Sequence, residues 1–449
     1  MSEAVTAKKG LMTEGVIWKQ LVLFSIPLLL GNLFQQLYNT VDSIVVGNYI
    51  GGNALAAVGS STPIVNLLVG LFTGIATGSG VVVSRFFGAQ DNKNVHDSVH
   101  TAIAVTFVSG IILSVAGVLL SPLLLRLIGT PEEVMVESTV YLRIYFSGVL
   151  AMMVYNMGSG ILRAIGDSRT PLYFLIVSSV VNIILDLVFV INFTMGIAGV
   201  AWATLTAQVV SALLVLMKLM QAQDSYRLIV GHIHINAPIL KEIVRLGLPG
   251  GIQNAIISFS NIIVQANINS FGPAAMAGCS SYTKVDGFAL LPVMSFSMAV
   301  TTFTGQNVGA GNYDRVRQGA KTCLKISLGV TAVLSACVFV FGRHIIGIFS
   351  SDPEILYYGT YMLFMLSPFY MALSVNHTCA GVIRGAGASL PPMLIMVGNM
   401  CLLRMVWIAL AMPFFHSIAV VFIGYSLTWV TSGLCMALYY KKARWLQEY

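Results

Sequence analysis

The chain has 449 residues, of which 57% are apolar and only 9% are charged. Its mean hydropathy of +0.84 exceeds what a soluble core requires, so the composition predicts a polytopic membrane protein. The net charge of +7 does not indicate nucleic-acid binding, because the basic residues stand in small groups between hydrophobic segments. No segments of alternating polar and apolar residues occur, which excludes a transmembrane barrel and favours an all-α fold.

Twelve hydrophobic runs of about twenty residues or more follow one another along the chain. The predicted transmembrane helices cover residues 17–46, 54–84, 95–121, 136–162, 170–191, 197–221, 242–271, 275–305, 316–342, 355–383, 391–413 and 417–440. Proline inside a spanning helix favours a kink. The predicted kink points are Pro27, Pro63, Pro249, Pro292 and Pro368.

The basic residues predict the orientation of these helices. Of the 24 Lys and Arg residues, only Arg126, Arg143 and Arg343 lie near odd-numbered gaps, and Lys284 and Arg404 lie inside spans. All the others flank the two ends or the even-numbered gaps. By the positive-inside rule, both termini are cytoplasmic. The polar first segment shows no cleavable signal peptide, so we expect a multi-pass protein of the cytoplasmic (inner) membrane, in contact with lipid.

The two halves of the chain repeat each other. The segment 160–166 (GILRAIG) recurs as 381–387 (GVIRGAG), and Pro171 recurs as Pro392. Six spans separate equivalent helices, so the repeats are parallel, an arrangement typical of alternating-access transporters. The predicted parts are a cytoplasmic segment 1–15, an amino-terminal lobe 16–221, a cytoplasmic connector 222–240, a carboxy-terminal lobe 241–440 and a cytoplasmic tail 441–449.

The sequence gives little evidence for a site that binds a transition metal. His232 and His234 lie two residues apart in the connector, but the sequence offers no third ligand nearby, so we predict a solvated loop. The six cysteines form no close CxxC pair, which indicates neither a metal site nor a disulfide framework.

The buried acidic residues do not follow the repeat. Of the 17 acidic residues, only Asp42, Asp186 and Asp286 lie well inside predicted spans. Their counterparts in the other half are uncharged: Ile263, Trp407 and Val65. The scaffold therefore does not need these carboxylates, which favours a functional role for them.

Asn182 and Asp186 stand four residues apart, so their side chains share one face of a helix. Asp186 lies about 24 Å along its helix from the cytoplasmic end, and Asp42 reaches a similar depth. Two carboxylates at one depth could bind a cation together or share a proton. We therefore predict an ion site, the alternative being a structural carboxylate satisfied by its neighbours.

Other polar side chains in the spans are candidate contacts for a cargo. Gln35, Tyr38 and Asn39 share a helical face with Asp42. Asp286 lies near mid-bilayer, where it either pairs with Arg404 or binds cargo, and the sequence favours neither alternative.

Several stretches resemble the multidrug and toxic compound extrusion (MATE) family. The pair GILRAIGDSRTP and GVIRGAGASLPP, with FQQLYNTVDSIVVGNYIG near the start, carries the resemblance from about residue 15 to 440. The early segment and NIILD are most similar to its prokaryotic DinF-like branch. The resemblance implies a V-shaped, two-lobe transporter that exports amphipathic, often cationic compounds in exchange for Na⁺ or H⁺.

The resemblance also implies roles for single residues. In that branch an acid of the first span and an Asn/Asp pair of the fifth form the amino-terminal-lobe site, matching Asp42, Asn182 and Asp186. A tyrosine and a threonine that line the site match Tyr141 and Thr206, with Thr204 as an alternative. Other branches carry acids in the seventh and tenth spans. Here Asn261, Gln265 and Asn376 stand there instead, so the resemblance does not support the carboxy-terminal cation site of those branches, and these amides are candidate cargo contacts.

The expected function is therefore secondary antiport of small organic compounds by a monomer, with no catalytic residue, no cofactor, and no metal beyond a possible Na⁺ at Asp42, Asn182 and Asp186. A flippase for a lipid-linked saccharide would need several cations in its cleft, and only Lys284 and Arg404 are available. An integral membrane enzyme acting on lipid would need a motif such as HExxH or GxSxG, and none occurs. A passive channel is disfavoured because no filter-like segment occurs.

Overall fold

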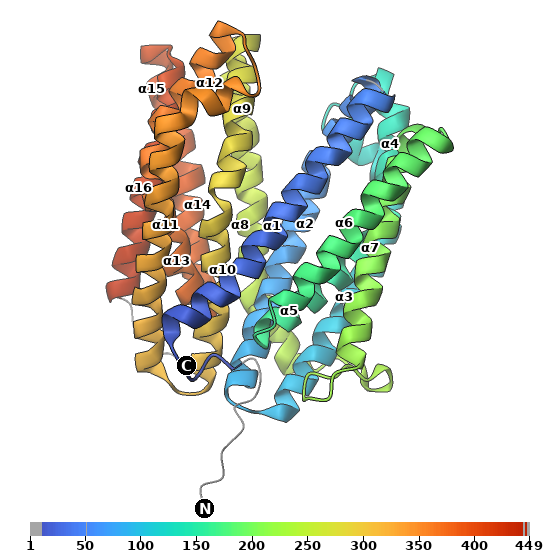
Figure 1. The fold of residues 1–449 in the computed structure, drawn as a ribbon, viewed down its shortest axis with the longest axis vertical. Coiled ribbons are helices and arrows are strands. Elements are labelled where there is room, and N and C mark those ends of the chain that lie inside the picture. The colour runs from blue at the N-terminus through green and yellow to red at the C-terminus, as the bar shows by residue number, and fades with distance from the viewer. Residues whose placement is uncertain (1–10, 51, 443–444, 447–449) are drawn as a thin grey trace, which may run out of the picture. The chain divides into compact units, whose positions relative to one another are not determined.

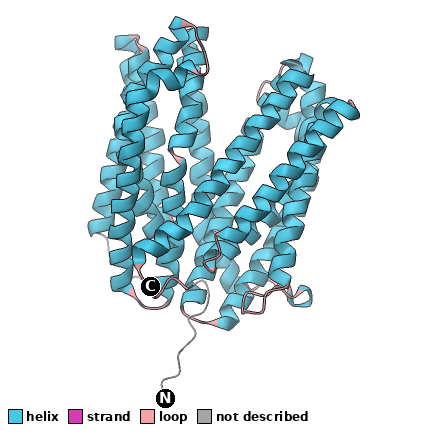
Figure 2. Cartoon of the chain, viewed as in Figure 1, coloured by secondary structure: helices cyan, strands magenta, loops and turns pink. Residues whose placement is uncertain are grey.

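A computed structural model describes residues 11–50, 52–442 and 445–446 of the protein. These residues form helices joined by turns and short loops, and none of them lies in a strand (Figures 1 and 2). The all-α prediction is confirmed.

The helices of the first half, in chain order, are α1 (Ile17–Val45), η1 (Val46–Ile50), α2 (Gly52–Gly88), α3 (Asn92–Leu127), α4 (Glu132–Ser147), α5 (Val149–Ala164), α6 (Arg169–Leu187), η2 (Val188–Asn192), α7 (Gly196–Met220) and η3 (Val230–His232). Those of the second half are α8 (Ala237–Asn269), α9 (Pro273–Ala289), α10 (Leu291–Gly309), α11 (Tyr313–Gly347), α12 (Pro353–Leu366), η4 (Ser367–Phe369), α13 (Tyr370–Gly385), α14 (Leu390–Val397), η5 (Gly398–Leu403), α15 (Arg404–Phe415) and α16 (Ile418–Lys442).

Each of the twelve predicted spans lies on one helix or on a run of consecutive helices. Among the described residues, nine helices are long and apolar enough to cross a membrane, and α4 with α5 makes a tenth pass bent by 46°. The other two predicted passes are α8 and the α12–α13 pair, which are helical but more polar. In α8, for example, Lys241, Glu242 and Arg245 occupy the first turns. The twelve-helix prediction is confirmed.

The chain forms two compact units, and two of its helices run from one unit into the other. Of the described residues, unit 1 contains 11, 30–50 and 52–251, and unit 2 contains 12–29, 252–442 and 445–446. The first part of α1 packs in the core of unit 2, where Leu21 and Phe24 are buried. The first part of α8 packs in the core of unit 1, where Ile243 is buried. The repeats thus exchange the beginnings of their first helices.

Within unit 1, the first part of α8 crosses α2 at the distance of touching backbones. A Cβ atom added to Gly74 would lie 2.2 Å from the backbone nitrogen of Gly251, and one added to Gly78 would lie 2.4 Å from that of Gly247. Two pairs of glycines four residues apart are what lets two membrane helices approach this closely.

The repeat is visible in equivalent helix contacts of the two units. In unit 1 a Cβ on Gly160 would lie 3.2 Å from the carbonyl oxygen of Ala76. In unit 2 the equivalent Gly381 would approach the carbonyl oxygen of Ser297, the counterpart of Ala76, to 2.6 Å. The repeated glycines therefore serve close packing in both units.

The predicted kink points fall into two groups. The helix is interrupted at Leu290, two residues before Pro292 in the first turn of α10, and at Pro368, inside the 3₁₀ turn between α12 and α13. At Pro27, Pro63 and Pro249 the helix instead continues through the proline. The bend between α4 and α5 occurs at Gly148, which was not predicted because the span contains no proline.

Candidate functional site

The deepest polar side chains of unit 1 lie on α6. Asn182 is 2% exposed and Asp186 is 0% exposed, whereas Val180 and Ile184 on the same helix are half exposed. The 3.6-residue period that turns the apolar residues outward turns the amide and the carboxylate into the unit. Neither the Asn182 amide nor the two Asp186 oxygens has a hydrogen-bond donor or acceptor among the described protein groups.

Asp42 of α1 meets Asp186 in this interior. The two carboxyl groups lie close enough to interact electrostatically, and Oδ1 of Asp42 is also buried without a protein donor. Two ionised carboxylates repel each other in a buried site, so a shared proton or a cation between them would stabilise the pair. Asp42 and Asp186 therefore lie in one neighbourhood, and their shared role in binding an ion stays a prediction.

Tyrosines surround the carboxyl pair. Tyr38 of α1 and Tyr141 of α4 both interact electrostatically with Asp42 and Asp186. The ring of Tyr145 stacks on that of Tyr141 with centroids 6.4 Å apart, and its hydroxyl donates to the sulfur of Met152 at 3.4 Å. Sequence reasoning missed Tyr145, although it follows Tyr141 by one helical turn and so shares its face.

The other predicted site residues of unit 1 lie on α1 and α7. Thr206 donates its hydroxyl to the carbonyl of Trp202 on its own helix at 2.8 Å. Gln35 and Asn39 are exposed on α1. The buried core of the site is therefore Asp42, Asn182 and Asp186.

The oxygen atoms of Asp42, Asn182 and Asp186 are suitable ligands for a small hard cation, and the two carboxylates can also bind a proton. The polar atoms of these side chains are all oxygens apart from the amide nitrogen of Asn182, and carboxylate and amide oxygens are what Na⁺ and similar cations prefer. Elsewhere in the described residues, no group of three or more His, Cys, Asp and Glu side chains is arranged to hold a metal ion.

The acid of unit 2 has a different environment. Tyr282 donates its hydroxyl to Oδ1 of Asp286 at 3.0 Å and lies 3.1 Å from the hydroxyl of Tyr370. The candidate partner Arg404 does not pair with it. Arg404 instead donates to Oγ1 of Thr428 at 3.2 Å and lies over the ring of Tyr425 at 4.0 Å. Of the two alternatives for Asp286, the ion pair with Arg404 is wrong, because tyrosine hydroxyls satisfy the acid.

The three amides that stand in place of acids in unit 2 do not converge. Asn261 and Gln265 are exposed on α8, where Gln265 donates to Oδ1 of Asn269 at 2.8 Å. Asn376 is completely buried in α13, and neither of its side-chain atoms has a protein partner. These amides form no cluster comparable to the carboxyl pair of unit 1.

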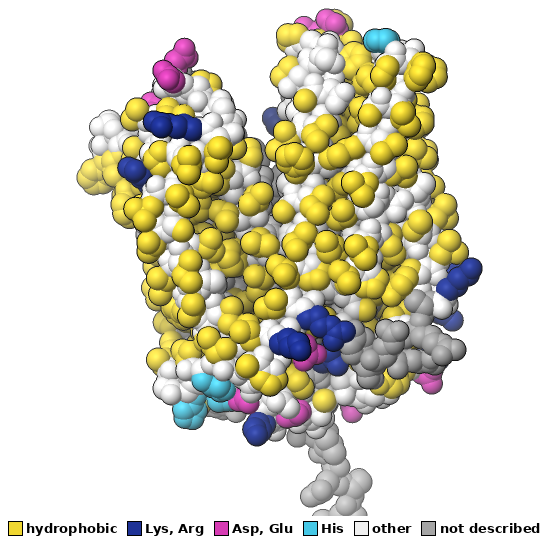
Figure 3. Space-filling view, turned by 180° about the vertical axis from the view of Figure 1, so that it is seen from behind, with side chains coloured by type: hydrophobic (Ala, Val, Ile, Leu, Met, Phe, Trp, Pro, Cys, Tyr) yellow, Lys and Arg dark blue, Asp and Glu magenta, His cyan; other side chains and the backbone are white. Residues whose placement is uncertain are grey.

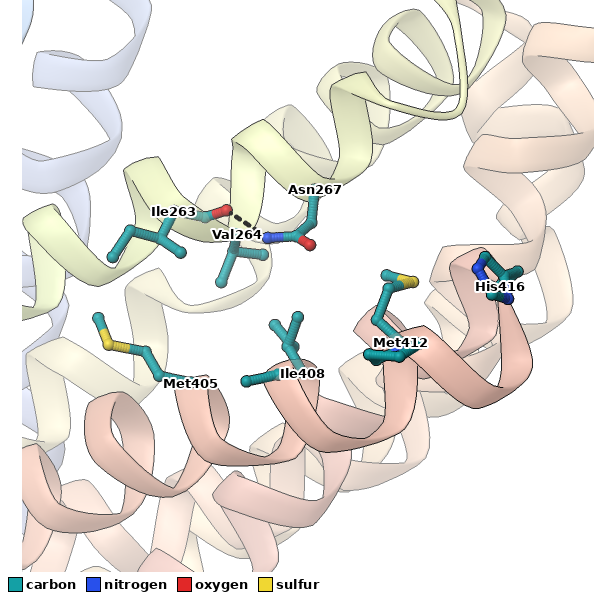
Figure 4. A pocket seen from close by; sticks show the side chains of 9 residues that line it. Ile263, Val264, Asn267, Met405, Ile408, Met412 and His416 are labelled. Carbon is teal, nitrogen blue, oxygen red and sulfur yellow. Dashed lines mark hydrogen bonds between the residues drawn. The ribbon is translucent and has the colours of Figure 1, made fainter.

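Unit 2 has an apolar groove where unit 1 has its carboxyl pair. The groove, of about 470 Å³, lies between α8 and α15 (Figure 4). Ile263, the counterpart of Asp42, lines it, and so does Ile408, the neighbour of Trp407, which is the counterpart of Asp186. The amide nitrogen of Asn267 in the wall donates to the carbonyl of Ile263 at 2.9 Å. The two repeats thus keep one scaffold and differ in the chemistry that they place on it.

Comparison with known proteins agrees with this architecture. The family model described as MatE matches the chain twice, over residues 27–188 and 249–410. The chain is 32% identical to the "Probable multidrug resistance protein YpnP" of Bacillus subtilis (strain 168) over 436 residues, 96% of this chain and 97% of that protein. It is 28% identical to the "Probable multidrug resistance protein NorM" of Thermotoga maritima, over 84% of this chain and 82% of that protein.

Solved structures show the same fold. A structure described as the outward-facing conformation of a multidrug resistance MATE family transporter of the MOP superfamily superposes with a TM-score of 0.90. It is 23% identical in sequence, and the match covers 96% of this chain and 97% of that one. A superfamily transporter from Pyrococcus furiosus, 22% identical, superposes with the same TM-score over the same shares of the two chains.

Proposed function

The chain belongs to the MATE family of multidrug efflux transporters, and we propose that it exports amphipathic, often cationic organic compounds in exchange for H⁺ or Na⁺. Members of this family are integral membrane transporters and not enzymes, which removes the lipid-modifying enzyme from the alternatives. We place the protein in the cytoplasmic membrane with both termini in the cytoplasm, following the distribution of its basic residues. We also propose that it acts as a monomer.

The observation that carries the proposal is the carboxyl pair of Asp42 and Asp186 beside Asn182. Buried like charges repel unless a cation or a proton lies between them. A loaded site therefore favours a tightly packed α1–α6 contact, and an empty, doubly charged site favours its separation. An ion with different affinities for the two packings shifts the equilibrium between them, and that difference is the force that drives exchange.

The cargo enters this scheme as the competitor of the ion. A cationic compound could neutralise the same carboxylates and lie against Tyr38 and Tyr141, whose rings attract cations. Ion and cargo then occupy the site in alternation, which is the requirement for antiport. The exposed Gln35 and Asn39 of α1 offer polar contacts on the same helix.

The flippase alternative gains no support from the structure. Arg404 is held by Thr428 and Tyr425, and the ammonium of Lys284 lies over the ring of Phe349 at 5.4 Å. A pyrophosphate cargo would need such bases to be available, whereas the carboxyl pair would repel it.

The test is efflux of an ethidium-type dye from proteoliposomes under an imposed pH gradient and, separately, under a Na⁺ gradient. We expect Asp186→Asn and Asp42→Asn to lose gradient-driven efflux, by at least about tenfold if one buried charge contact is removed. Asp314→Asn is the control, because it removes an exposed carboxylate that lies outside the carboxyl pair and the candidate cargo contacts. Full efflux by Asp186→Asn under both gradients would show that the carboxyl pair does not couple the ion.

A further inference from the structure

Four of the seven histidines gather around Asp97, where the connector meets α3. His96 and His100 lie one turn apart on α3, and their rings stack with centroids 3.9 Å apart. The connector contributes His232, whose ring lies 5.7 Å from that of His96, and His234, whose ring lies 6.4 Å from that of His100. Histidine side chains, in cyan, gather beside acidic ones at the lower left of Figure 3. Only His232 and His234 of this cluster were considered on the sequence alone.

His100 is one of the side chains that hold the connector, together with Leu228, which is buried in the core of unit 1. It is completely buried, and its Nδ1 lies 2.7 Å from the carbonyl oxygen of His96, so Nδ1 carries a proton. Its Nε2 accepts the backbone N–H of Ile229 in the connector at 3.0 Å. One neutral tautomer makes both bonds. A protonated ring would present a donor at Nε2, toward the Ile229 carbonyl 3.2 Å away, and the Ile229 amide would lose its acceptor.

The groups around the histidine cluster disfavour a positive charge on more than one of its imidazole rings. Asp97 faces the cluster, with Oδ1 3.6 Å from Nδ1 of His96 and 3.8 Å from Nε2 of His234. A single carboxylate can compensate one imidazolium, so further protonation leaves stacked like charges. On the α7 side, Arg227 donates to the carbonyl of Met220 and adds a permanent positive charge to the connector.

The end of the connector depends on the same surface of α3. The backbone N–H of Asn236 donates to Oγ1 of Thr101 at 3.1 Å, and its side-chain nitrogen lies 3.5 Å from Oδ2 of Asp97. The side-chain oxygen of Asn236 then accepts the N–H of Ile239 in the first turn of α8. The position of the start of α8 therefore depends on the docked connector.

In unit 2 the segment before the first helix is also held by side chains of neighbouring helices, but none of these side chains is a histidine. In unit 2, residues 12–15 precede α1 and dock beside α10 and α11. The N–H of Met12 donates to Oε1 of Gln306 at 2.7 Å, the side chain of Asn307 donates to the Met12 carbonyl at 3.2 Å, and Arg315 donates to the carbonyls of Met12, Glu14 and Gly15. Amides and guanidinium do not titrate between about pH 5 and 8, whereas histidine does.

We propose that residues 222–236, docked on α3 through His100, form a pH-sensitive latch that is closed while His100 is neutral and opens when the compartment on the connector's side acidifies. The opened latch no longer holds the start of α8, the helix that passes from unit 1 into unit 2. The protein thereby senses pH at a place separate from its carboxyl pair, and the inference does not depend on which ion drives export.

The test measures the latch directly, in the full-length protein in lipid nanodiscs. Spin labels are placed at Lys93→Cys and Val230→Cys, both exposed positions of unit 1, after the exposed Cys337 and Cys435 are changed to serine. Electron–electron double resonance is recorded between about pH 8 and 5.5. We expect a narrow distance distribution at high pH and a longer, broad population that grows as the pH falls and imidazole becomes protonated.

Variants of the pivot assign this transition. His100→Gln retains an oxygen that accepts the Ile229 N–H at every pH, so its distribution should stay narrow. His100→Arg should be open throughout, and His344→Gln, at an exposed histidine of α11, should titrate like wild type. A second label pair at Val16→Cys and Tyr313→Cys reports residues 12–15 and should not respond to pH.

A wild-type distribution that does not change down to about pH 5.5 would overturn the latch, and so would a His100→Gln protein that titrates like wild type. Opening caused by a chelator at neutral pH would also overturn it, since a metal would then hold the connector. The labels report in Asp42→Asn and Asp186→Asn proteins as well, so a failure of ion coupling and a failure of the latch are separate results.

Discussion

The glycine crossing of α2 and α8 makes a quantitative prediction for Gly78→Ala. The added Cβ would lie 2.4 Å from the backbone nitrogen and 2.5 Å from the Cα of Gly247. Ordinary contacts of a Cβ lie at 3.4–4 Å, so α8 would have to retreat by about 1 Å. Both obstructing atoms belong to a helix backbone and cannot rotate away.

The expected cost is that of an overpacked core, about 1–3 kcal/mol. For a unit of this size each kcal/mol corresponds to about 2–4 °C, so the melting temperature should fall by about 2–12 °C. The same movement loosens the contact that holds the first part of α8 to unit 1, and the rate of dye efflux should fall as well.

Thermal unfolding of the purified full chain in detergent, followed by far-ultraviolet circular dichroism, measures the change. Gly329→Ala is the matched control, because no atom lies within 4 Å of its added Cβ on the exposed side of α11. It should melt at or slightly above the wild-type temperature, since alanine favours helix over glycine by about 0.5–1 kcal/mol.

A double substitution tests whether one contact is responsible. Gly247→Ala obstructs the same crossing, with its Cβ 2.7 Å from the Cα of Ile75. Once the helices have separated for one alanine, the second should cost less, so the double variant should lose less stability than the two single variants combined. A Gly78→Ala protein that melts and exports like Gly329→Ala would refute the close contact.

Two further predictions concern the arginines of unit 2. Arg404→Lys should lower the melting temperature, because an ammonium cannot both stack on Tyr425 and reach Thr428 as the planar guanidinium does; a loss of about 1–3 kcal/mol is expected, and an unchanged melting curve would contradict it. Arg315→Ala removes the donors to the Met12 carbonyl and its neighbours, so amide exchange of residues 12–16 should rise at least about tenfold in mass spectrometry while the connector peptide is unaffected. Equal protection of residues 12–16 in both proteins would show that Gln306 and Asn307 hold them without Arg315.

Much of this fold follows from the sequence for a simple reason. Backbone groups inside a bilayer must pair within their own helix, so hydropathy predicts the position of each span. The same holds for features inside one helix: the shared face of Asn182 and Asp186 and the bond between Tyr282 and Asp286 follow from the helical period.

The repeat could also be recognised from the sequence, because close packing requires glycine at equivalent places. Gly160 and Gly381 contact equivalent neighbours in their units. The acids that break the repeat identified the ion-site candidates, since a scaffold that folds with Ile263 and Trp407 does not need carboxylates at those positions. The identity of the ion and of the cargo stays a prediction.

Contacts between helices were decided only by the tertiary structure. Asp42 meets Asp186 across two helices, Asp286 bonds to tyrosines while Arg404 turns to Tyr425, and His100 binds a backbone group 129 residues away. Spacing along one helix determines which face a side chain occupies, but not which helix that face meets. That depends on crossing angles and on packing against residues far away in the chain, and a local pattern contains no record of either.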